Sequence, residues 1–238
     1  MTPTIVLVHG AFADSSSWDG VVDALLAEGH RVVAFANPLR GVADDAAQLT
    51  ALVRAIDGPV LLVGHSYGGA VITNVPADAG AIAGLVYVAA FPLTPGESCA
   101  DASALVPGST LGETLETVPL PGDAADLRIA QDRYHQQFCA DVPAAQATRM
   151  AVAQRPITAA ALSEASGAAA LWSTVPSWFV FGDEDRNIPV GALRTMAERA
   201  GSRGTTELAG ASHALGVSRA AEVAAVVLEA ARASAVPA

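Results

Sequence analysis

The stretch LLVGHSYGGA, residues 61–70, places one serine, Ser66, in a glycine-rich turn directly after a run of apolar residues. A strand, a sharp turn and a helix in this order form the setting that a nucleophile elbow requires. We expect Gly64 and Gly68 to be needed there, because so tight a turn leaves no room for Cβ atoms beside the serine. A bare Gly-x-Ser-x-Gly pattern is weak by itself, since it arises by chance in roughly one chain in ten of this length and glycine content. The alternative, an ordinary glycine turn with an idle serine, has to be weighed against the rest of the chain.

Around this turn, apolar segments of strand length alternate with helical segments. Strands are predicted at residues 4–10, 31–36, 59–65, 82–90, 177–183 and 205–211, and helices at 17–30, 43–56, 190–201 and 219–233. Nearly continuous apolar strands separated by helices indicate a parallel sheet covered on both faces. The pattern predicts an α/β fold with about six mostly parallel strands flanked by helices. Functional sites of such folds lie at the carboxyl ends of the strands.

The alternation stops between Phe91 and about Leu171, where prolines, glycines and short helical patches show no convincing strand. We interpret residues 92–171 as a mainly helical cap inserted over the sheet, with the alanine-rich part, 158–170, as helix and a flexible linker as the alternative for it. Residues 1–91 and 172–238 then form the core.

Composition excludes several classes of function. The net charge of −11 disfavours nucleic acid as a partner, because phosphate binding needs a basic face. All 13 basic residues are arginines, which excludes a P-loop lysine, a Schiff-base lysine and a lysine general base. No apolar run is long enough to span a bilayer, and the segment MTPTIVLVHG lacks the basic start of a signal peptide. We therefore expect a cytoplasmic protein with a small-molecule partner, no membrane partner and free thiols at Cys99 and Cys139; the sequence does not predict the oligomeric state.

An elbow serine needs a base, and the chain offers five histidines: His9, His30, His65, His135 and His213. His65 adjoins Ser66, but neighbouring residues of a strand point to opposite faces. His213 follows the last predicted strand at the correct edge of the sheet, and we predict that it is the base.

The base needs an orienting acid, and GDEDRNIP, residues 182–189, directly follows the fifth predicted strand. The alternating oxygen side chains also suggest a calcium loop. That pattern fails, because Ile188 stands where an EF-hand needs glycine and Arg194 where it needs glutamate. Asp183, Glu184 and Asp185 remain as candidate acids that spacing alone does not separate.

Two further groups complete the expected site. The backbone N–H of Tyr67 and one from the loop after the first strand, where Gly10 allows a close approach, would hold an oxyanion. An aromatic set is expected to line a pocket beneath the cap, with ordinary core packing as the alternative: Phe12, Tyr67, Phe91, Phe138 and Trp172.

The segments LVHGAFADSSSWDGVVDALLAEGHRVVAFANPLRG, VGHSYGGAV, GDEDRNIP and ASHA resemble the α/β-hydrolase superfamily, in particular small serine esterases related to plant methylesterases and hydroxynitrile lyases. The resemblance covers most of residues 4–91 and 172–230, and the cap matches only loosely. It implies a catalytic triad of Ser66, Asp185 and His213, with Ala11 as the second oxyanion donor. Hydroxynitrile lyases of this type carry a lysine after the catalytic histidine; alanine in its place, Ala214, argues against cyanohydrin cleavage.

These observations predict hydrolysis of a small carboxylic ester through an acyl-enzyme, without metal or organic cofactor. Cofactor-free perhydrolysis and C–C bond hydrolysis use the same residues and stay open as alternatives. A non-catalytic ligand-binding protein of the same fold is a third hypothesis. A dinucleotide-dependent dehydrogenase is excluded, because the first strand runs into HGAFAD rather than Gly-x-Gly-x-x-Gly.

Overall fold

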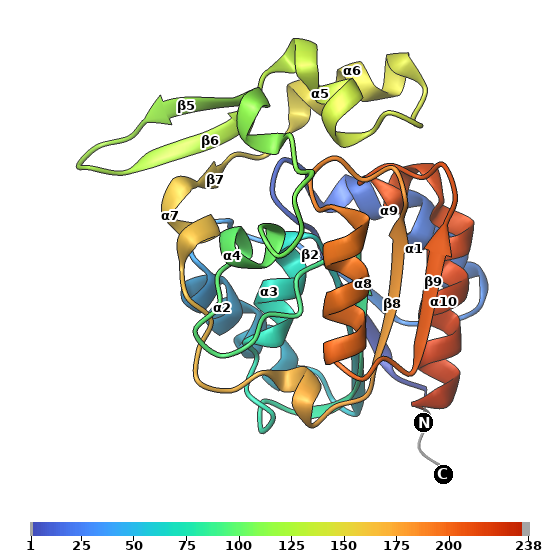
Figure 1. Ribbon diagram of the computed structural model, residues 1–238. Helices are drawn as coiled ribbons and strands as arrows, with labels where there is room; N and C mark the ends of the chain where they lie inside the picture. Colours follow the sequence, from blue (N-terminus) through green and yellow to red (C-terminus); the bar gives the residue numbers. More distant parts are fainter. Residues whose placement is uncertain (1, 235–238) are drawn as a thin grey trace.

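The computed structural model describes residues 2–234, and its centre is a six-stranded parallel sheet (Figure 1). The strand order is β2-β1-β3-β4-β8-β9, and every neighbouring pair is parallel. The strands are β1 (Thr4–Val8), β2 (Val32–Phe35), β3 (Pro59–His65), β4 (Ala81–Val88), β8 (Ser177–Gly182) and β9 (Gly204–Leu208). All residues of β1, β3 and β8 are buried, as their continuous apolar sequences predict. The predicted six-stranded sheet is confirmed.

Helices cover both faces of this sheet (Figure 1). The helices α1 (Asp19–Ala27) and α10 (Ala220–Ala233) pack together on one face. The other face carries α2 (Val42–Arg54), α3 (Tyr67–Thr73) and α8 (Val190–Arg199). The predicted helices are present with shifted ends; a 3₁₀ turn, η1 (Ser15–Trp18), precedes α1, and α9 (Leu215–Ser218) precedes α10. Within residues 2–234, no helix combines the length and apolar character needed to cross a bilayer.

The insertion lies over the edge of the sheet where the strands end (Figure 1). Its helical elements are α4 (Cys99–Ser103), η2 (Leu111–Thr114), α5 (Gln131–Phe138), α6 (Ala144–Ala153), α7 (Ala159–Ser163) and, at its end, η3 (Leu171–Ser173). It also contains an antiparallel sheet of β5 (Leu115–Pro119), β6 (Ala125–Ile129) and β7 (Ile157–Thr158). The expectation of no strand in this region was wrong. These strands are short; β5 is mostly exposed and β6 is half-buried, so neither carries the apolar run that marks a buried strand.

The predicted helix over 158–170 was also wrong beyond its first part, because α7 ends at Ser163. The next residue, Glu164, has extended backbone, and its carboxylate accepts hydrogen bonds from the backbone N–H groups of Val42 and Ala43. These are free N–H groups of the first turn of α2, which an anionic acceptor stabilises. A tertiary contact therefore replaces the helix that the alanines favour.

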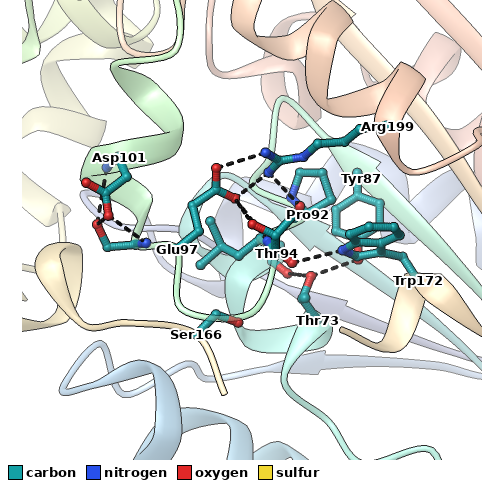
Figure 2. A network of polar contacts seen from close by, with 12 residues as sticks. Thr73, Tyr87, Pro92, Thr94, Glu97, Asp101, Ser166, Trp172 and Arg199 are labelled. Atoms are coloured by element: carbon teal, nitrogen blue, oxygen red, sulfur yellow. Dashed lines mark hydrogen bonds and ion pairs between the residues drawn. The ribbon is translucent and has the colours of Figure 1, made fainter. Parts of the chain in front are cut away.

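The start of the cap is fastened to the core by a part-buried polar network (Figure 2). The guanidinium of Arg199, at the end of α8, donates to both carboxylate oxygens of Glu97 and to the carbonyl of Pro92. Glu97 also accepts from the Thr94 N–H at 2.9 Å, and its carbonyl accepts from the Ser166 N–H at 2.8 Å. The ion pair thus ties the start of the insertion to α8, and the backbone hydrogen bond from Ser166 joins a later part of the insertion to the same residue.

Candidate active site

Ser66 lies in the turn between β3 and α3 with a backbone conformation of φ 53° and ψ −123°. Residues with a Cβ atom rarely adopt positive φ, and such strain costs on the order of 1–3 kcal/mol unless its surroundings maintain it. Here the Ser66 N–H donates to the Val88 carbonyl at 3.2 Å, and the Ser66 carbonyl accepts from Gly69 and Phe91. The end of β4 therefore holds the strained turn in place.

Glycines make this turn possible, since an added Cβ would collide with backbone on every side. A Cβ on Gly68 would lie 2.3 Å from the Val8 carbonyl oxygen, and one on Gly64 would lie 2.6 Å from the Gly68 carbonyl oxygen. The predicted need for these two glycines is confirmed. A Cβ on Gly10 would meet the Ser66 Cβ at 2.6 Å, so the loop after β1 lies directly against the serine.

His213 and Asp185 form a buried pair on neighbouring loops after β9 and β8. Nδ1 of His213 lies 2.6 Å from Oδ2 of Asp185, and Oδ1 of Asp185 accepts from the N–H groups of Asn187 and Ile188. Asp183 instead accepts from the Gly210 N–H at 2.7 Å on the surface. The aspartate in contact with His213 is therefore Asp185.

The hydrogen bond to Asp185 has a chemical consequence for the imidazole. With the proton on Nδ1 donated to the carboxylate, Nε2 of a neutral His213 carries a lone pair. His213 is only 1% exposed, and within residues 2–234 its Nε2 has no hydrogen-bond partner. This geometry leaves a buried, oriented nitrogen free to accept a proton.

His65 supports this loop in a way that the sequence did not reveal. Its Nε2 lies 3.0 Å from the carbonyl oxygen of His213, and the two rings are 4.8 Å apart. Burial, with His213 as a second cause, holds the pKa of His65 well below its ordinary value. The side chain is therefore neutral at pH 7 and donates Nε2–H to that carbonyl, which fixes the backbone at His213.

The other histidines lie apart from this pair. His9 donates Nδ1–H to the Gly10 carbonyl and accepts from the Asn37 N–H at Nε2, and burial lowers the pKa of His9. It therefore braces the loop after β1. His135 lies in the cap, where its Nε2 bonds the Val142 carbonyl oxygen at 2.8 Å.

Two backbone donors stand beside Ser66 without acceptors. Within the described part of the chain, neither the Ala11 N–H nor the Tyr67 N–H donates a hydrogen bond. Tyr67 begins α3, so its N–H has no partner one turn earlier in the helix. Its hydroxyl donates to the buried Oδ2 of Asp45 at 2.9 Å, and burial raises the pKa of both groups. Asp45 was missed by sequence reasoning; a carboxylate on the apolar face of a predicted helix was its only signal.

A cavity of about 430 Å³ extends from Ser66 into the cap. Among residues 2–234, no aspartate, glutamate, arginine or histidine side chain lines it; most of its wall is apolar, including Phe12, Phe91, Val106, Leu111, Leu162 and Ile188. A separate hollow of about 290 Å³ between η1 and α6 includes none of the predicted site residues. Among the described residues, no three histidine, cysteine, aspartate or glutamate side chains gather as a metal site.

The predicted aromatic set is divided by the structure. Phe12, Tyr67 and Phe91 line the cavity, whereas Phe138 and Trp172 do not. The Phe138 ring packs against His213, with ring centres 5.1 Å apart. Trp172 donates its indole N–H to the Leu93 carbonyl at 2.9 Å, at the base of the cap (Figure 2). These contacts come from chain segments distant in sequence, which is why composition alone did not separate the aromatics.

The two thiols are free and buried. Cys99 lines the cavity, and burial raises its pKa. Burial raises the pKa of Cys139 to about 12. Both side chains are therefore protonated at neutral pH and poor nucleophiles.

Comparison with known proteins agrees with this architecture. A family model described as the alpha/beta hydrolase family matches residues 5–226. Polyneuridine aldehyde esterase has a similar structure, with a TM-score of 0.80 and 19% identity over 96% of this chain and 99% of that one. A methylesterase from Arabidopsis gives a TM-score of 0.80 and 18% identity over 97% and 99% of the two chains.

Tomato methylketone synthase I, in complex with 2-tridecanone, is similar to the same degree: its TM-score is 0.80, with 18% identity over 99% of this chain and 100% of that chain. At these identities the likeness establishes the fold alone. The comparison with curated proteins gave no match. The family model spans nearly the whole chain, and the chain therefore belongs to the alpha/beta hydrolase family.

Proposed function

We propose that this protein is a serine hydrolase that cleaves a small carboxylic ester through an acyl-enzyme intermediate. The observation that carries the proposal is the buried His213–Asp185 pair with a free Nε2. Its loop is bonded to the strained elbow through His65, the residue before Ser66, whose Nε2 lies 3.0 Å from the His213 carbonyl oxygen. A serine hydroxyl is a weak nucleophile until an oriented base takes its proton. The esterases among the similar structures support an ester as the substrate class.

In the proposed mechanism, Ser66 Oγ attacks the acyl carbon while Nε2 of His213 takes the hydroxyl proton. Asp185 orients the imidazole and stabilises the imidazolium, and the N–H groups of Ala11 and Tyr67 hold the oxyanion. His213 then gives the proton to the leaving alcohol, and the acyl group remains on Ser66. A water molecule, deprotonated by His213, attacks the acyl carbon; the bond to Ser66 Oγ then breaks, His213 returns the proton to Oγ, and the acid is released from the free enzyme. These steps require no metal or organic cofactor.

The free Nε2 of His213 means that the base makes no hydrogen bond to Ser66 in this state. Catalytic hydrogen bonds are often long or poorly aligned before substrate binds and tighten in the complex. We infer that filling the cavity brings the hydroxyl and the imidazole together. A serine reagent that occupies the cavity therefore tests the proposal directly.

The cavity supports a neutral, mainly apolar ester. Its volume of about 430 Å³ lies within the range of small-molecule sites, and no charged side chain faces it. We propose that Phe12 and Phe91 contact the acyl or alcohol group. We also propose that the protein is cytoplasmic and that it binds neither nucleic acid nor membranes.

The test is the intact mass of the protein after reaction with a fluorophosphonate, for wild type and for Ser66→Ala. We expect one adduct on wild type and none on the variant, followed by turnover on a panel of neutral esters. A folded wild type that takes no adduct and turns over no ester would contradict the proposal and favour a ligand-binding protein. Perhydrolysis and C–C bond hydrolysis are separated by their products, since both leave Ser66 reactive.

A further inference from the structure

One stretch of the cap, residues 137–141, contacts both loops that carry the His213–Asp185 pair. It comprises the last two residues of α5 and the three that follow. This 137–141 segment lies in the insertion, far in sequence from both loops. Its contacts fall on the two residues that follow Asp185 and on the two that flank His213.

Gln137 holds the loop after β8. Its side-chain N–H₂ group donates to the Arg186 carbonyl at 2.9 Å and to Oδ1 of Asn187 at 2.8 Å. Its own Oε1 accepts from the Thr110 hydroxyl at 2.8 Å, which fixes the orientation of the amide. Asn187 is one of the two residues whose N–H binds Oδ1 of Asp185. Other cap residues bond the same backbone: the Ser103 and Ser109 hydroxyls donate to the Asn187 carbonyl, and the Thr110 N–H donates to the Arg186 carbonyl. Gln137 is the residue that binds both the Arg186 carbonyl and the Asn187 side chain.

Phe138 and Asp141 hold the loop that carries His213. The Ala214 N–H donates to the Phe138 carbonyl at 3.1 Å, and the Ser212 hydroxyl donates to Oδ1 of Asp141. Asp141 also lies 3.8 Å from the guanidinium of Arg219, and the Phe138 ring packs edge-on against the imidazole. Both sequence neighbours of His213 are thus bonded to the 137–141 segment.

We propose that the 137–141 segment is a positioning element that aligns the His213–Asp185 pair. The Ser66 turn does not depend on it, since β1, β4 and the glycines of the core supply the contacts that hold the serine. The two parts of the proposed site therefore depend on different regions. The core holds the Ser66 turn, and the cap, through its contacts with both loops, orients His213 and Asp185. The expected effect on turnover rests on the proposed function, whereas the effect on loop order does not.

The test compares two identical changes within the cap, Gln137→Met and Gln154→Met. Each removes a glutamine that makes three hydrogen bonds, but those of Gln154 go only to Ile129 and Ala151 inside the cap. The measurements are kcat and KM on an ester that the wild type hydrolyses, and residue-level backbone amide exchange by NMR. The informative amides are those of Asn187, Ile188 and Ala214.

For Gln137→Met we expect faster exchange at these amides and a 10- to 100-fold fall in kcat with little change in KM, since small misplacements of catalytic groups have about this effect. Gln154→Met should change neither the exchange of these amides nor kcat. Wild-type exchange in Gln137→Met, or faster exchange without loss of kcat, would overturn the proposal. If the wild type proves unreactive with fluorophosphonate and esters, the proposed function fails. In that case, amide exchange in Gln137→Met still shows whether the 137–141 segment holds the two loops.

A second pair of variants keeps the test decisive if Gln137→Met fails to fold. Asp141→Asn retains an oxygen acceptor for the Ser212 hydroxyl, whereas Asp141→Ala removes it. We expect near-wild-type kcat for the asparagine variant and at least a 10-fold fall for the alanine variant. Equal losses in both variants would overturn positioning through this hydrogen bond.

Discussion

The Ser66 turn and the cap meet at one cavity, yet they are built in opposite ways. The turn is held by backbone hydrogen bonds and by glycines whose replacement would collide with backbone atoms. The cap consists of short elements joined to the core mainly by side chains, such as Glu97, Gln137, Asp141 and Glu164. Backbone contacts within the sheet leave one geometry, whereas side-chain contacts change with single substitutions. We therefore expect substitutions in the cap to change substrate preference and the alignment of the proposed base, and substitutions in the elbow to disrupt the site itself.

The largest expected effect on activity comes from replacing the proposed nucleophile, compared with replacing a residue of the cavity wall. Ser66→Ala should lower kcat by roughly 10⁴- to 10⁶-fold, as removal of a triad nucleophile does. Leu111→Ala, in the cap wall, should mainly raise KM and change preference between acyl chain lengths by about 10- to 100-fold. Steady-state kinetics on an ester series measures both. Comparable kcat for wild type and Ser66→Ala would place the chemistry elsewhere.

The acid is tested by a matched pair in one loop. Asp185→Asn should lower kcat by about 10⁴-fold, because the amide orients the wrong imidazole tautomer. Asp183→Asn keeps an acceptor for the Gly210 N–H on the surface and should leave kcat nearly unchanged. A greater loss at Asp183 than at Asp185, at equal folded protein, would contradict the assignment.

Glycine substitutions compare the packing of the two regions. Gly68→Ala should destabilise the fold by about 3 kcal/mol or more, because its Cβ would lie 2.3 Å from the Val8 carbonyl oxygen. Gly112→Ala in the cap meets no heavy atom within 4 Å and should change stability by less than about 1 kcal/mol. Urea denaturation gives both values. Similar losses at the two positions would mean that the cap is as tightly packed as the elbow.

Two ion pairs, one inside the cap and one between the cap and the core, should contribute different amounts to stability, with the more buried pair contributing more. Arg199→Gln removes the pair with Glu97, whose side chains are 22% and 11% exposed, and should cost about 1–3 kcal/mol. Arg128→Gln removes a pair with Glu116 in which both side chains are more than 40% exposed, and its effect should be below about 0.5 kcal/mol. Thermal unfolding of the two variants, with wild type as reference, provides the measurement. No difference between them would show that the cap is not fastened through Glu97.

The smallest effect is the pH dependence that the core histidines create. Burial lowers the pKa of His9 and His65 from 6.5, so near pH 6 the unfolded chain binds protons that the folded chain does not. Stability should therefore fall as pH drops from 7.5 to 5.5, with a limiting slope of about 1.4 kcal/mol per pH unit for each histidine. His65→Gln should reduce this slope, measured by urea denaturation across the range. An unchanged slope in the variant would contradict a neutral, buried His65.

Local sequence was sufficient for the core because its determinants are short-range. The alternation of apolar strands and helices predicted the sheet, and glycines on either side of Ser66 predicted a turn with no room for Cβ atoms. The same reasoning gave wrong secondary structure for parts of the cap, for a physical reason. The strands β5 and β6 are mostly exposed or half-buried and carry no apolar run. The alanines after Ser163 leave the helix because Glu164 binds the start of α2.

The sequence by itself determined the parallel sheet, the glycine-rich turn of Ser66 and the loops in which a histidine and several acidic residues follow separate strands, because these features depend on residues close together in the chain. Only the tertiary structure decided which aspartate contacts His213, and which aromatics line the cavity. It also decided that the 137–141 segment bonds both loops of the pair. Each of these depends on contacts between segments far apart in sequence. Spacing along a chain carries no information on such contacts until the fold brings the segments together.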